Sequence, residues 1–213
     1  MEKKEISKAT IERMPQYLRY LRLAFESGKK YASSADIAEN INVSAVLVRK
    51  DLSRVSSVSG KPRKGFEIQR LIGDIEKFLG YDNLSDAVVV GAGGLGKAFL
   101  GYDRFKKHGL NIVAAFDIDS SIIGKEISGK RIYPMEKLVP FVQENHIRIG
   151  ILTVPKTVAK DTLDLLVSAG VKGVGNFAAT KLKAPTDVVV KTEDLSASLA
   201  LLAGELILRE GEK

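Results

Sequence analysis

The sequence of 213 residues contains no cysteine and only two histidines, His108 and His146. The absence of cysteine excludes disulfide bonds, thiol redox chemistry and cysteine-ligated metal sites, and we expect no bound metal. No apolar run approaches the ~20 residues of a membrane-spanning helix, and the first five residues lack the apolar segment of a secretory signal. We therefore expect a cytoplasmic protein with no membrane partner.

Positive charge is concentrated in the first part of the chain. The net charge is +7, and residues 1–80 hold 16 Lys and Arg against 10 Asp and Glu, while residues 81–213 hold 17 against 16. A hydrophobic content of 45% suits one or two globular domains. The uneven charge indicates a polyanionic partner for the first part, although a solvated basic surface would have the same composition.

The clearest motif is a valine run that ends in glycines, at residues 87–96. The spacing of Gly91, Gly93 and Gly96 is that of a dinucleotide-binding loop: the first glycine allows a tight turn, the second lets the backbone approach a pyrophosphate, and the third lets helix pack closely on strand. Asp117 ends the next apolar run, where a carboxylate can accept from a ribose 2′-hydroxyl and repel a 2′-phosphate. The pattern predicts bound NAD(H). Alternatively, the glycines serve only the turn of a Rossmann scaffold.

The first 80 residues have the pattern of a helix-turn-helix. Helices are predicted at residues 8–26, 35–40, 45–54 and 68–79. Ser44 is the expected N-cap of the third helix, Val48 and Leu52 are expected to pack inward, and Leu47, Lys50 and Arg54 share the opposite face. After this basic helix, which also carries Arg49, we expect a β-hairpin wing with strands 55–58 and 66–68.

The expected wing has three cations at its tip, Lys61, Arg63 and Lys64. A cationic helix followed by a cationic wing is typical of proteins that bind double-stranded DNA. The predicted DNA contacts are Ser44, Leu47, Arg49, Lys50, Arg54, Lys61, Arg63 and Lys64, with Leu47 placed to touch a thymine methyl group. The alternative is a solvated amphipathic surface.

The second part of the chain alternates strand and helix patterns. Strands are predicted at 87–90, 112–117, 148–153, 172–176 and 187–190, with helices at 95–107, 134–144 and 156–169. This alternation predicts the α/β class, a Rossmann-like doubly wound parallel sheet with helices on both faces. The expected domains are a winged-helix domain at 1–80, a Rossmann domain at 85–191 and a terminal helix within 194–213. The apolar stripe of that helix folds back on its own sheet or crosses to a second subunit.

Several short segments, in the same order, resemble the Rex family of redox-sensing transcriptional repressors. They are Val48-Arg49-Lys50-Asp51-Leu52-Ser53, Phe116-Asp117-Ile118-Asp119, Leu152-Thr153-Val154-Pro155, Gly175-Asn176-Phe177-Ala178 and Asp194-Leu195-Ser196. The chain departs from the family pattern at Leu47, where glutamine is common, and at Ala179, where proline is expected. The resemblance covers nearly the whole length.

The resemblance implies a homodimer that exchanges its C-terminal helix, binds palindromic operator DNA and is released from it by NADH. The implied cofactor-binding residues are Gly91, Ala92, Gly93, Gly94, Leu95, Gly96, Asp117, Val154, Pro155, Asn176 and Phe177. It also implies that Arg19, Tyr102 and Asp194 meet at a domain interface and act as a switch. Otherwise, Arg19 is a solvated cation, Tyr102 a surface aromatic and Asp194 only a helix cap.

Two other classes of function compete with a sensor. An NAD-dependent oxidoreductase needs a proton relay near the nicotinamide. His108 and His146 are expected at the wrong end of the sheet for this role, and Tyr102 and Lys156 lack a catalytic spacing. A CoA-binding module with an appended basic domain is the third class, which Asp117 disfavours by charge repulsion. We predict a repressor that is not an enzyme.

Overall fold

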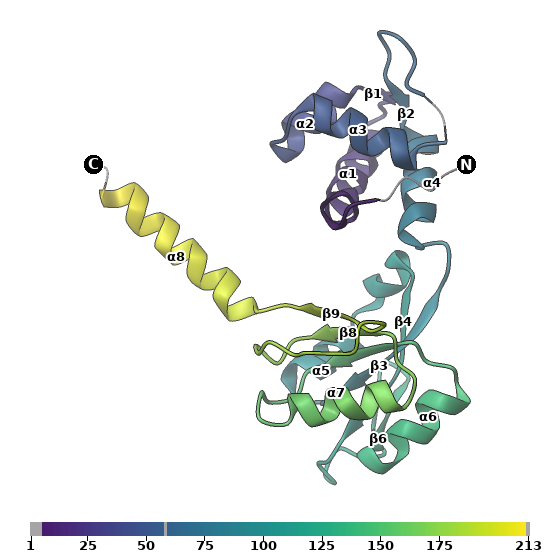
Figure 1. Ribbon diagram of the computed structural model, residues 1–213, viewed down its shortest axis with the longest axis vertical. Helices are drawn as coiled ribbons and strands as arrows, with labels where there is room; N and C mark the ends of the chain where they lie inside the picture. Colours follow the sequence, from purple (N-terminus) through teal and green to yellow (C-terminus); the bar gives the residue numbers. More distant parts are fainter. Residues whose placement is uncertain (1–5, 58, 212–213) are drawn as a thin grey trace. The chain divides into compact units, whose positions relative to one another are not determined.

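The computed structural model describes residues 6–57 and 59–211, and it divides into two compact units, Met1–Asn83 and Leu84–Lys213 (Figure 1). Each unit has its own buried core: the first is built around Met14, Tyr17 and Leu21, and the second around its central strands. None of the helices within the described ranges is long and apolar enough to cross a membrane.

The first unit consists of four helices and two short strands. They are α1 (Lys8–Glu26), β1 (Tyr31–Ala32), α2 (Ser34–Ile41), α3 (Ala45–Val55), β2 (Phe66–Glu67) and α4 (Ile68–Leu79). Serines begin the first three helices: the side chains of Ser7, Ser33 and Ser44 accept hydrogen bonds from backbone N–H groups in the first turn. Pro15 lies inside α1 without ending it.

The wing differs from its prediction. Phe66–Glu67 pairs antiparallel with Tyr31–Ala32, whereas Val55 belongs to α3 and residues 56–57 form no strand. Residue 58, the last of the predicted strand 55–58, lies outside the described ranges. A Cβ on Gly65 would stand 2.2 Å from the carbonyl oxygen of Ala32, so this glycine allows the returning chain to lie directly against β1. An isolated bridge between Lys61 and Gly65 closes the tip.

The second unit is a seven-stranded sheet in the order β5-β6-β4-β3-β7-β8-β9. Its strands are β3 (Ser85–Val90), β4 (Leu110–Asp117), β5 (Glu126–Ile127), β6 (Lys130–Pro134), β7 (Ile149–Leu152), β8 (Gly173–Asn176) and β9 (Val189–Thr192). All neighbouring strands are parallel except the β5–β6 hairpin. This arrangement confirms the doubly wound parallel sheet.

Helices cover both faces of this sheet. On one face, Val88 and Val90 pack in a core with residues of α6 (Leu138–Glu144) and α7 (Ala159–Ser168). On the other face, Val89 and Ala115 pack with residues of α5 (Gly94–Leu100) and of the 3-10 helix η1 (Asp103–His108). The valine run of β3 is therefore buried on both sides, as expected for a central parallel strand.

Further differences from the predicted elements lie in the second unit. The expected helix 95–107 divides at Gly101 into α5 and η1, and the rings of Phe99 and Phe105 meet edge to face at 5.5 Å between centroids across the break. The β5–β6 hairpin lies where the sequence analysis placed no element. It turns through Ser128 and Gly129, both at positive φ, which suits a tight hairpin turn.

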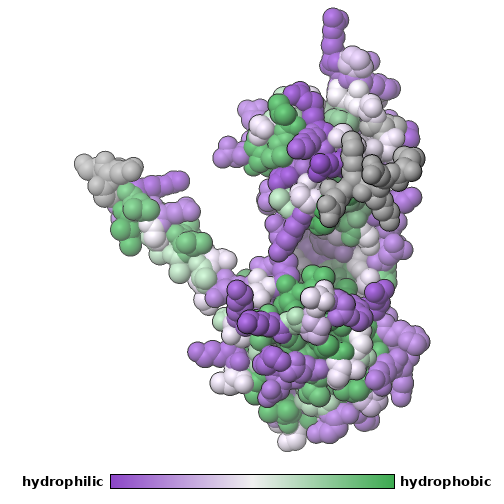
Figure 2. Space-filling view, in the orientation of Figure 1, coloured by the Kyte–Doolittle hydropathy of each residue, from purple (hydrophilic) through white to green (hydrophobic). Residues whose placement is uncertain are grey.

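The C-terminal helix α8 (Leu195–Gly211) is exposed along its length: every side chain described in it, at residues 195–210, is exposed. Seven of these are large apolar side chains, at positions 195, 199, 201, 202, 206, 207 and 208, and Figure 2 shows hydrophobic residues following the helix. The helix therefore does not fold back on the sheet of its own chain.

Candidate functional site

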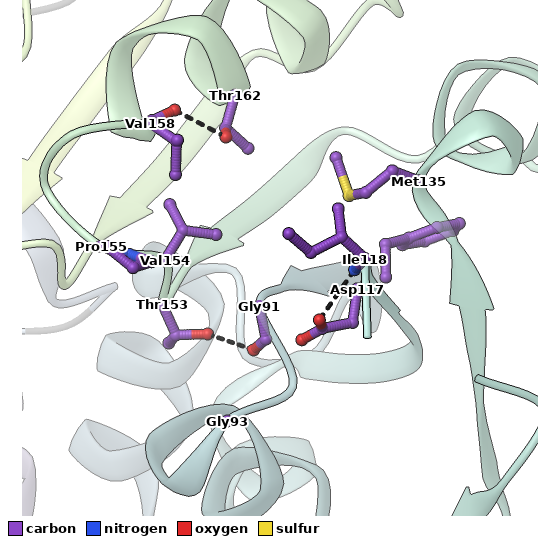
Figure 3. Close-up of a pocket in the computed structure, with 11 residues that line it drawn as sticks. Gly91, Gly93, Asp117, Ile118, Met135, Thr153, Val154, Pro155, Val158 and Thr162 are labelled. Atoms are coloured by element: carbon purple, nitrogen blue, oxygen red, sulfur yellow. Dashed lines mark hydrogen bonds between the residues drawn. The ribbon is translucent and has the colours of Figure 1, made fainter. Parts of the chain in front are cut away.

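A cavity of about 550 Å³ opens at the carboxyl ends of β3, β4 and β7, where open α/β sheets bind their ligands (Figure 3). Its volume lies within the range of small-molecule sites, roughly 300–1,000 Å³. The residues that line it are Gly91, Gly93, Phe116, Asp117, Ile118, Met135, Thr153, Val154, Pro155, Val158 and Thr162. The cavity thus brings the predicted glycine loop together with Asp117 and with Val154–Pro155.

The three fingerprint glycines meet different surroundings. Gly91 has φ +94°, and a Cβ there would stand 2.8 Å from the carbonyl oxygen of Thr153. A Cβ on Gly96 would stand 1.9 Å from the carbonyl oxygen of Gly91, so only glycine allows α5 to pack this closely on the turn. Apart from its chain neighbours, no atom of the described residues lies within 4 Å of a Cβ built on Gly93. Gly93 therefore faces open space, where a pyrophosphate could approach the backbone.

Asp117 ties the end of β4 to the glycine loop. Its Oδ2 accepts a hydrogen bond from Ala92 N–H at 2.5 Å, and its Oδ1 accepts from the N–H groups of Ile118 and Asp119 at 2.7 and 3.0 Å. Two carboxylate oxygens offer about four acceptor sites, so one remains for a ribose hydroxyl. Asp117 thus shapes the loop in addition to facing the cavity, a role that spacing did not indicate.

Thr153 lines the side of the cavity opposite Asp117, and the sequence analysis did not include it among the site residues. Its Oγ1 lies 2.6 Å from the carbonyl oxygen of Gly91 and 3.1 Å from that of Val90, and the hydroxyl donates to this pair of acceptors. Ile118, Met135, Val158 and Thr162 also line the cavity and were not predicted. Ile118 and Thr153 directly follow β4 and β7, so the rule that ligands bind at strand ends could have found these two.

Asn176 and Phe177 are absent from the lining of this cavity. The buried Asn176 side chain donates to Thr180 O at 2.6 Å and to Thr192 Oγ1 at 3.1 Å, and it accepts from Ala178 N–H at 3.0 Å. Phe177 packs against the ring of Phe99, with centroids 4.8 Å apart. Both residues therefore fix the loop after β8.

Ala179 stands in that loop with φ +48°. Proline is locked near φ −65° and cannot adopt this conformation. The departure from the family pattern at Ala179 thus coincides with a backbone conformation that excludes proline.

The cavity contains little acid–base chemistry. Asp117 is the only ionisable group among the described residues that line it. His108 ends η1 before β4, and His146 precedes β7, both at the amino ends of strands and away from the cavity. The described residues also hold no cluster of histidine and acidic side chains suited to a metal ion. The arrangement can bind and orient a ligand, and the described residues that line it include no His, Lys or Tyr that could relay a proton.

The first unit presents a basic helix face. Val48 and Leu52 are fully buried, as predicted, while Arg49 and Lys50 are exposed. Leu47 and Arg54 are half-buried, so they lie at the border of the exposed face. The apolar side chain that points outward is that of Val46, which is 65% exposed. The prediction that Leu47 lies opposite the buried side therefore requires correction, because Asp51 is buried together with Val48 and Leu52, and the face opposite these three is centred on Val46 and Lys50.

The cations of the wing tip are exposed as well. The ammonium groups of Lys61 and Lys64 lie 5.7 and 5.9 Å from the centroid of the Tyr31 ring, within cation–π range. Arg63 has φ +62° and is exposed. The wing thus carries three cations despite a strand pairing that differs from the predicted hairpin.

A buried carboxylate anchors the basic helix from behind. Asp51 is 1% exposed and accepts hydrogen bonds from Thr10 Oγ1 at 3.0 Å, from Tyr17 OH at 2.8 Å and from two nitrogens of Arg13. Burial acts to raise the pKa of Asp51, but the hydrogen bonds from Arg13, Tyr17 and Thr10 outweigh it and lower the pKa below 3.8. Burial, reinforced by the hydrogen bond to Asp51, raises the pKa of Tyr17 to about 12.

The three predicted switch residues occupy different places. In the first unit, Arg19 lines a second cavity of about 400 Å³ with residues of α1 and α2. In the second unit, Tyr102 is half-exposed and its ring meets that of Phe105 at 5.0 Å, while Asp194 Oδ1 accepts from Ala197 N–H at 2.9 Å and so caps α8. The helix cap accounts for the position of Asp194 without a switch, whereas Arg19 is an exposed cation.

Comparisons with known proteins agree with both units. Residues 82–180 match the model of the CoA binding domain, and residues 5–53 match the model of a putative DNA-binding protein N-terminus. The chain is 41% identical to the redox-sensing transcriptional repressor Rex of Treponema denticola, over 95% of this chain and 96% of the relative.

Two solved structures of RSP, a Rex-family repressor, are similar throughout. The complex of RSP with β-NAD⁺ and operator DNA is 35% identical, with a TM-score of 0.90, and covers 97% of this chain and 95% of its own. The complex of RSP with β-NADH is 35% identical, with a TM-score of 0.87, and covers 96% of each chain. Because identity at this level extends over both units and nearly the full length, the protein belongs to the Rex family of redox-sensing transcriptional repressors.

Proposed function

We propose that this protein is a cytoplasmic, homodimeric transcriptional repressor that binds operator DNA and is released from it when its second unit binds NADH. It is a sensor and not an enzyme. The observation that carries the proposal is the presence, in one chain, of a dinucleotide-type cavity without a proton relay and a basic recognition helix. Family membership supports the same assignment.

The residues of the cavity suit an adenine dinucleotide. Gly93 leaves its backbone open to a pyrophosphate, and Asp117 retains acceptor capacity for the adenosine ribose. A carboxylate at this position disfavours the 2′-phosphate of NADP(H) by charge repulsion. The first turn of α5, which directly follows the loop, contains Gly94, Leu95 and Gly96. Asn176 and Phe177 act on the cofactor through the loop after β8.

The first unit supplies the DNA contacts. Arg49 and Lys50 lie on the exposed face of α3, which we assign to the major groove, and Lys61, Arg63 and Lys64 contact phosphates from the wing. Ser44 caps α3 at its first turn, next to the face that we assign to the DNA, and Arg54 borders the same face. Two such units related by two-fold symmetry require a palindromic site.

Dimerisation accounts for the exposed helix α8. Large apolar side chains at 199, 202, 206 and 207 are more than half exposed in the single chain, and a contiguous apolar surface of this kind is typical of a subunit interface. We propose that α8 packs on the partner subunit. In the NADH-bound dimer, cofactor binding by the second unit is coupled to DNA binding by the first unit through Arg19, Tyr102 and Asp194.

The test is DNA binding measured with and without cofactors. Wild-type protein is used to select a duplex from random DNA, and fluorescence anisotropy then measures its affinity in the presence of NADH, NAD⁺, NADPH and CoA. We expect tight binding without cofactor, release by NADH, competition by NAD⁺ without release, and little effect of NADPH or CoA. Oxidation of NADH without selective DNA binding would support the oxidoreductase alternative, and displacement of NADH by CoA would support the CoA-binding module.

A further inference from the structure

The exposed face of α3 carries one large apolar side chain among polar ones. Val46, Arg49, Lys50 and Ser53 are all exposed, and their spacing of three, four and seven residues places them on one face of the helix. Val48, Asp51 and Leu52 are buried on the other side. The outward position of Val46 is therefore set by the core and not by its own contacts.

Val46 is the most exposed large apolar side chain that the structure describes in the first unit, at 65%, compared with 56% for Leu23 and 47% for Phe25. A single exposed valine is common on protein surfaces and alone indicates nothing. Here, however, it lies in the first turn of a helix with Arg49 and Lys50 beside it on the same face. The cations of that face would bring a polyanion directly against the valine.

In the major groove of DNA, one kind of group is a suitable partner for an exposed apolar side chain. Residues near the N-terminus of a recognition helix contact base edges in the major groove. Hydrogen-bond donors and acceptors occupy most of those edges, and the 5-methyl group of thymine is the apolar feature. Arginine and lysine beside the valine have their own preferred partner, guanine O6 and N7.

We propose that Val46 contacts the 5-methyl group of a thymine in each operator half-site and makes the protein select thymine there. The inference rests on the proposed function, since it names a specificity determinant of the same DNA-binding face. It also replaces Leu47 as the side chain expected to touch that methyl group, because Leu47 is half-buried and lies at the border of the face.

The experiment removes the methyl group without changing base pairing. Each thymine of the selected duplex is replaced singly by deoxyuridine, and binding is measured by fluorescence anisotropy with wild-type protein, Val46→Ala and Val189→Ala. The last variant is a matched control, because Val189 is 73% exposed but lies in β9 of the second unit. Thermal unfolding of each variant checks that the exposed substitution leaves the fold intact.

We expect one thymine per half-site whose replacement weakens wild-type binding about four-fold, the effect of one buried methyl group. Val46→Ala should bind the thymine duplex more weakly and lose the difference between thymine and deoxyuridine at that position, as a double-mutant cycle requires for direct contact. Val189→Ala should keep the wild-type ratio.

Two results would overturn the inference while leaving the proposed function intact: no thymine is sensitive to loss of its methyl group, or the sensitivity persists in Val46→Ala. Persistence would assign the effect to Leu47 or to DNA shape. Failure of wild-type protein to select any duplex from random DNA would overturn the proposed function, and the inference with it.

Discussion

Asp51 of α3 accepts two hydrogen bonds from the guanidinium group of Arg13 in α1, 2.7 Å from Nε and 3.0 Å from Nη2. A fork of this kind fixes the relative rotation of the two groups as well as their distance. Asp51 is buried, whereas the Arg13 side chain is 20% exposed. The basic helix is thereby attached to α1 by a polar network behind its exposed face.

Removal of Asp51 should strongly destabilise the first unit. Asp51→Ala leaves Arg13 without its partner and a buried Tyr17 hydroxyl without its acceptor, and we expect a loss of about 3–5 kcal/mol in the free energy of unfolding. Urea denaturation measures the loss, and hydrogen exchange assigns it to α1 and α3. Glu76→Ala is the control, because the Arg22–Glu76 pair is about one third exposed and should contribute about 1 kcal/mol or less. Equal losses in both variants would contradict the role of the network.

The Asp51 carboxylate should also make the free energy of unfolding decrease in acid. The pKa of Asp51 is lowered in the folded protein from its ordinary 3.8, because hydrogen bonds from Arg13, Tyr17 and Thr10 outweigh the effect of burial. Its contribution is therefore fully present above about pH 4 and is lost as the pH falls through the lower folded-state pKa. We expect the unfolding free energy of wild type to decrease below pH 4 more steeply than that of Asp51→Asn. Parallel pH profiles would show that other carboxylates dominate.

Asp117 should determine the affinity for NADH and the preference for NADH over NADPH. Asp117→Asn removes the charge that accepts from the ribose, and we expect NADH binding to weaken about ten- to a hundred-fold, the range for hydrogen bonds to a charged group. The preference over NADPH should narrow, because the 2′-phosphate is no longer repelled. Calorimetric titration with both cofactors measures the change, with Asp164→Asn on the exposed surface of α7 as the matched control. Unchanged affinity would remove Asp117 from the site.

The wing cations should determine the salt dependence of DNA binding. Lys64→Ala should reduce the slope of log affinity against log salt by ~1, because one phosphate contact and its counterion release are lost. The change should be the same for specific and random duplexes. Lys160→Ala in α7, where the lysine pairs with Asp164, should leave the slope unchanged. An unaltered slope in Lys64→Ala would exclude this lysine from the interface.

Arg19 and Asp194 should transmit the cofactor signal. Arg19→Ala and Asp194→Asn are expected to keep NADH affinity within about two-fold but to reduce the release of DNA by NADH, with a coupling loss of ~1–3 kcal/mol, or roughly 5–150-fold in operator affinity. Asparagine retains the capacity to cap α8, so loss of the cap is separated from loss of the charge. If both variants release DNA at wild-type NADH concentrations, the signal follows another route.

Local sequence patterns were sufficient to predict several helices, the parallel sheet and part of the candidate site. The bounds of α1 and α4 agree with the predicted 8–26 and 68–79, because apolar spacing along a helix is a property of neighbouring residues. The glycine loop and Asp117 were found by spacing, since a strand, a tight turn and a helix in succession leave few ways to place those residues. The parallel sheet likewise followed from alternation of strand and helix.

Tertiary contacts decided the rest. The pairing of Phe66–Glu67 with Tyr31–Ala32 joins segments far apart in the chain, so the wing sequence could not indicate its partner. The bond from Thr153 to the Gly91 carbonyl and the burial of Asp51 against Arg13 depend equally on distant residues. Asp51 is buried with Val48 and Leu52, so the outward face of α3 carries Val46 and leaves Leu47 at its border; helical spacing alone could not show that Asp51 is buried. Sequence determines which surfaces a helix has, whereas packing determines which of them faces the solvent.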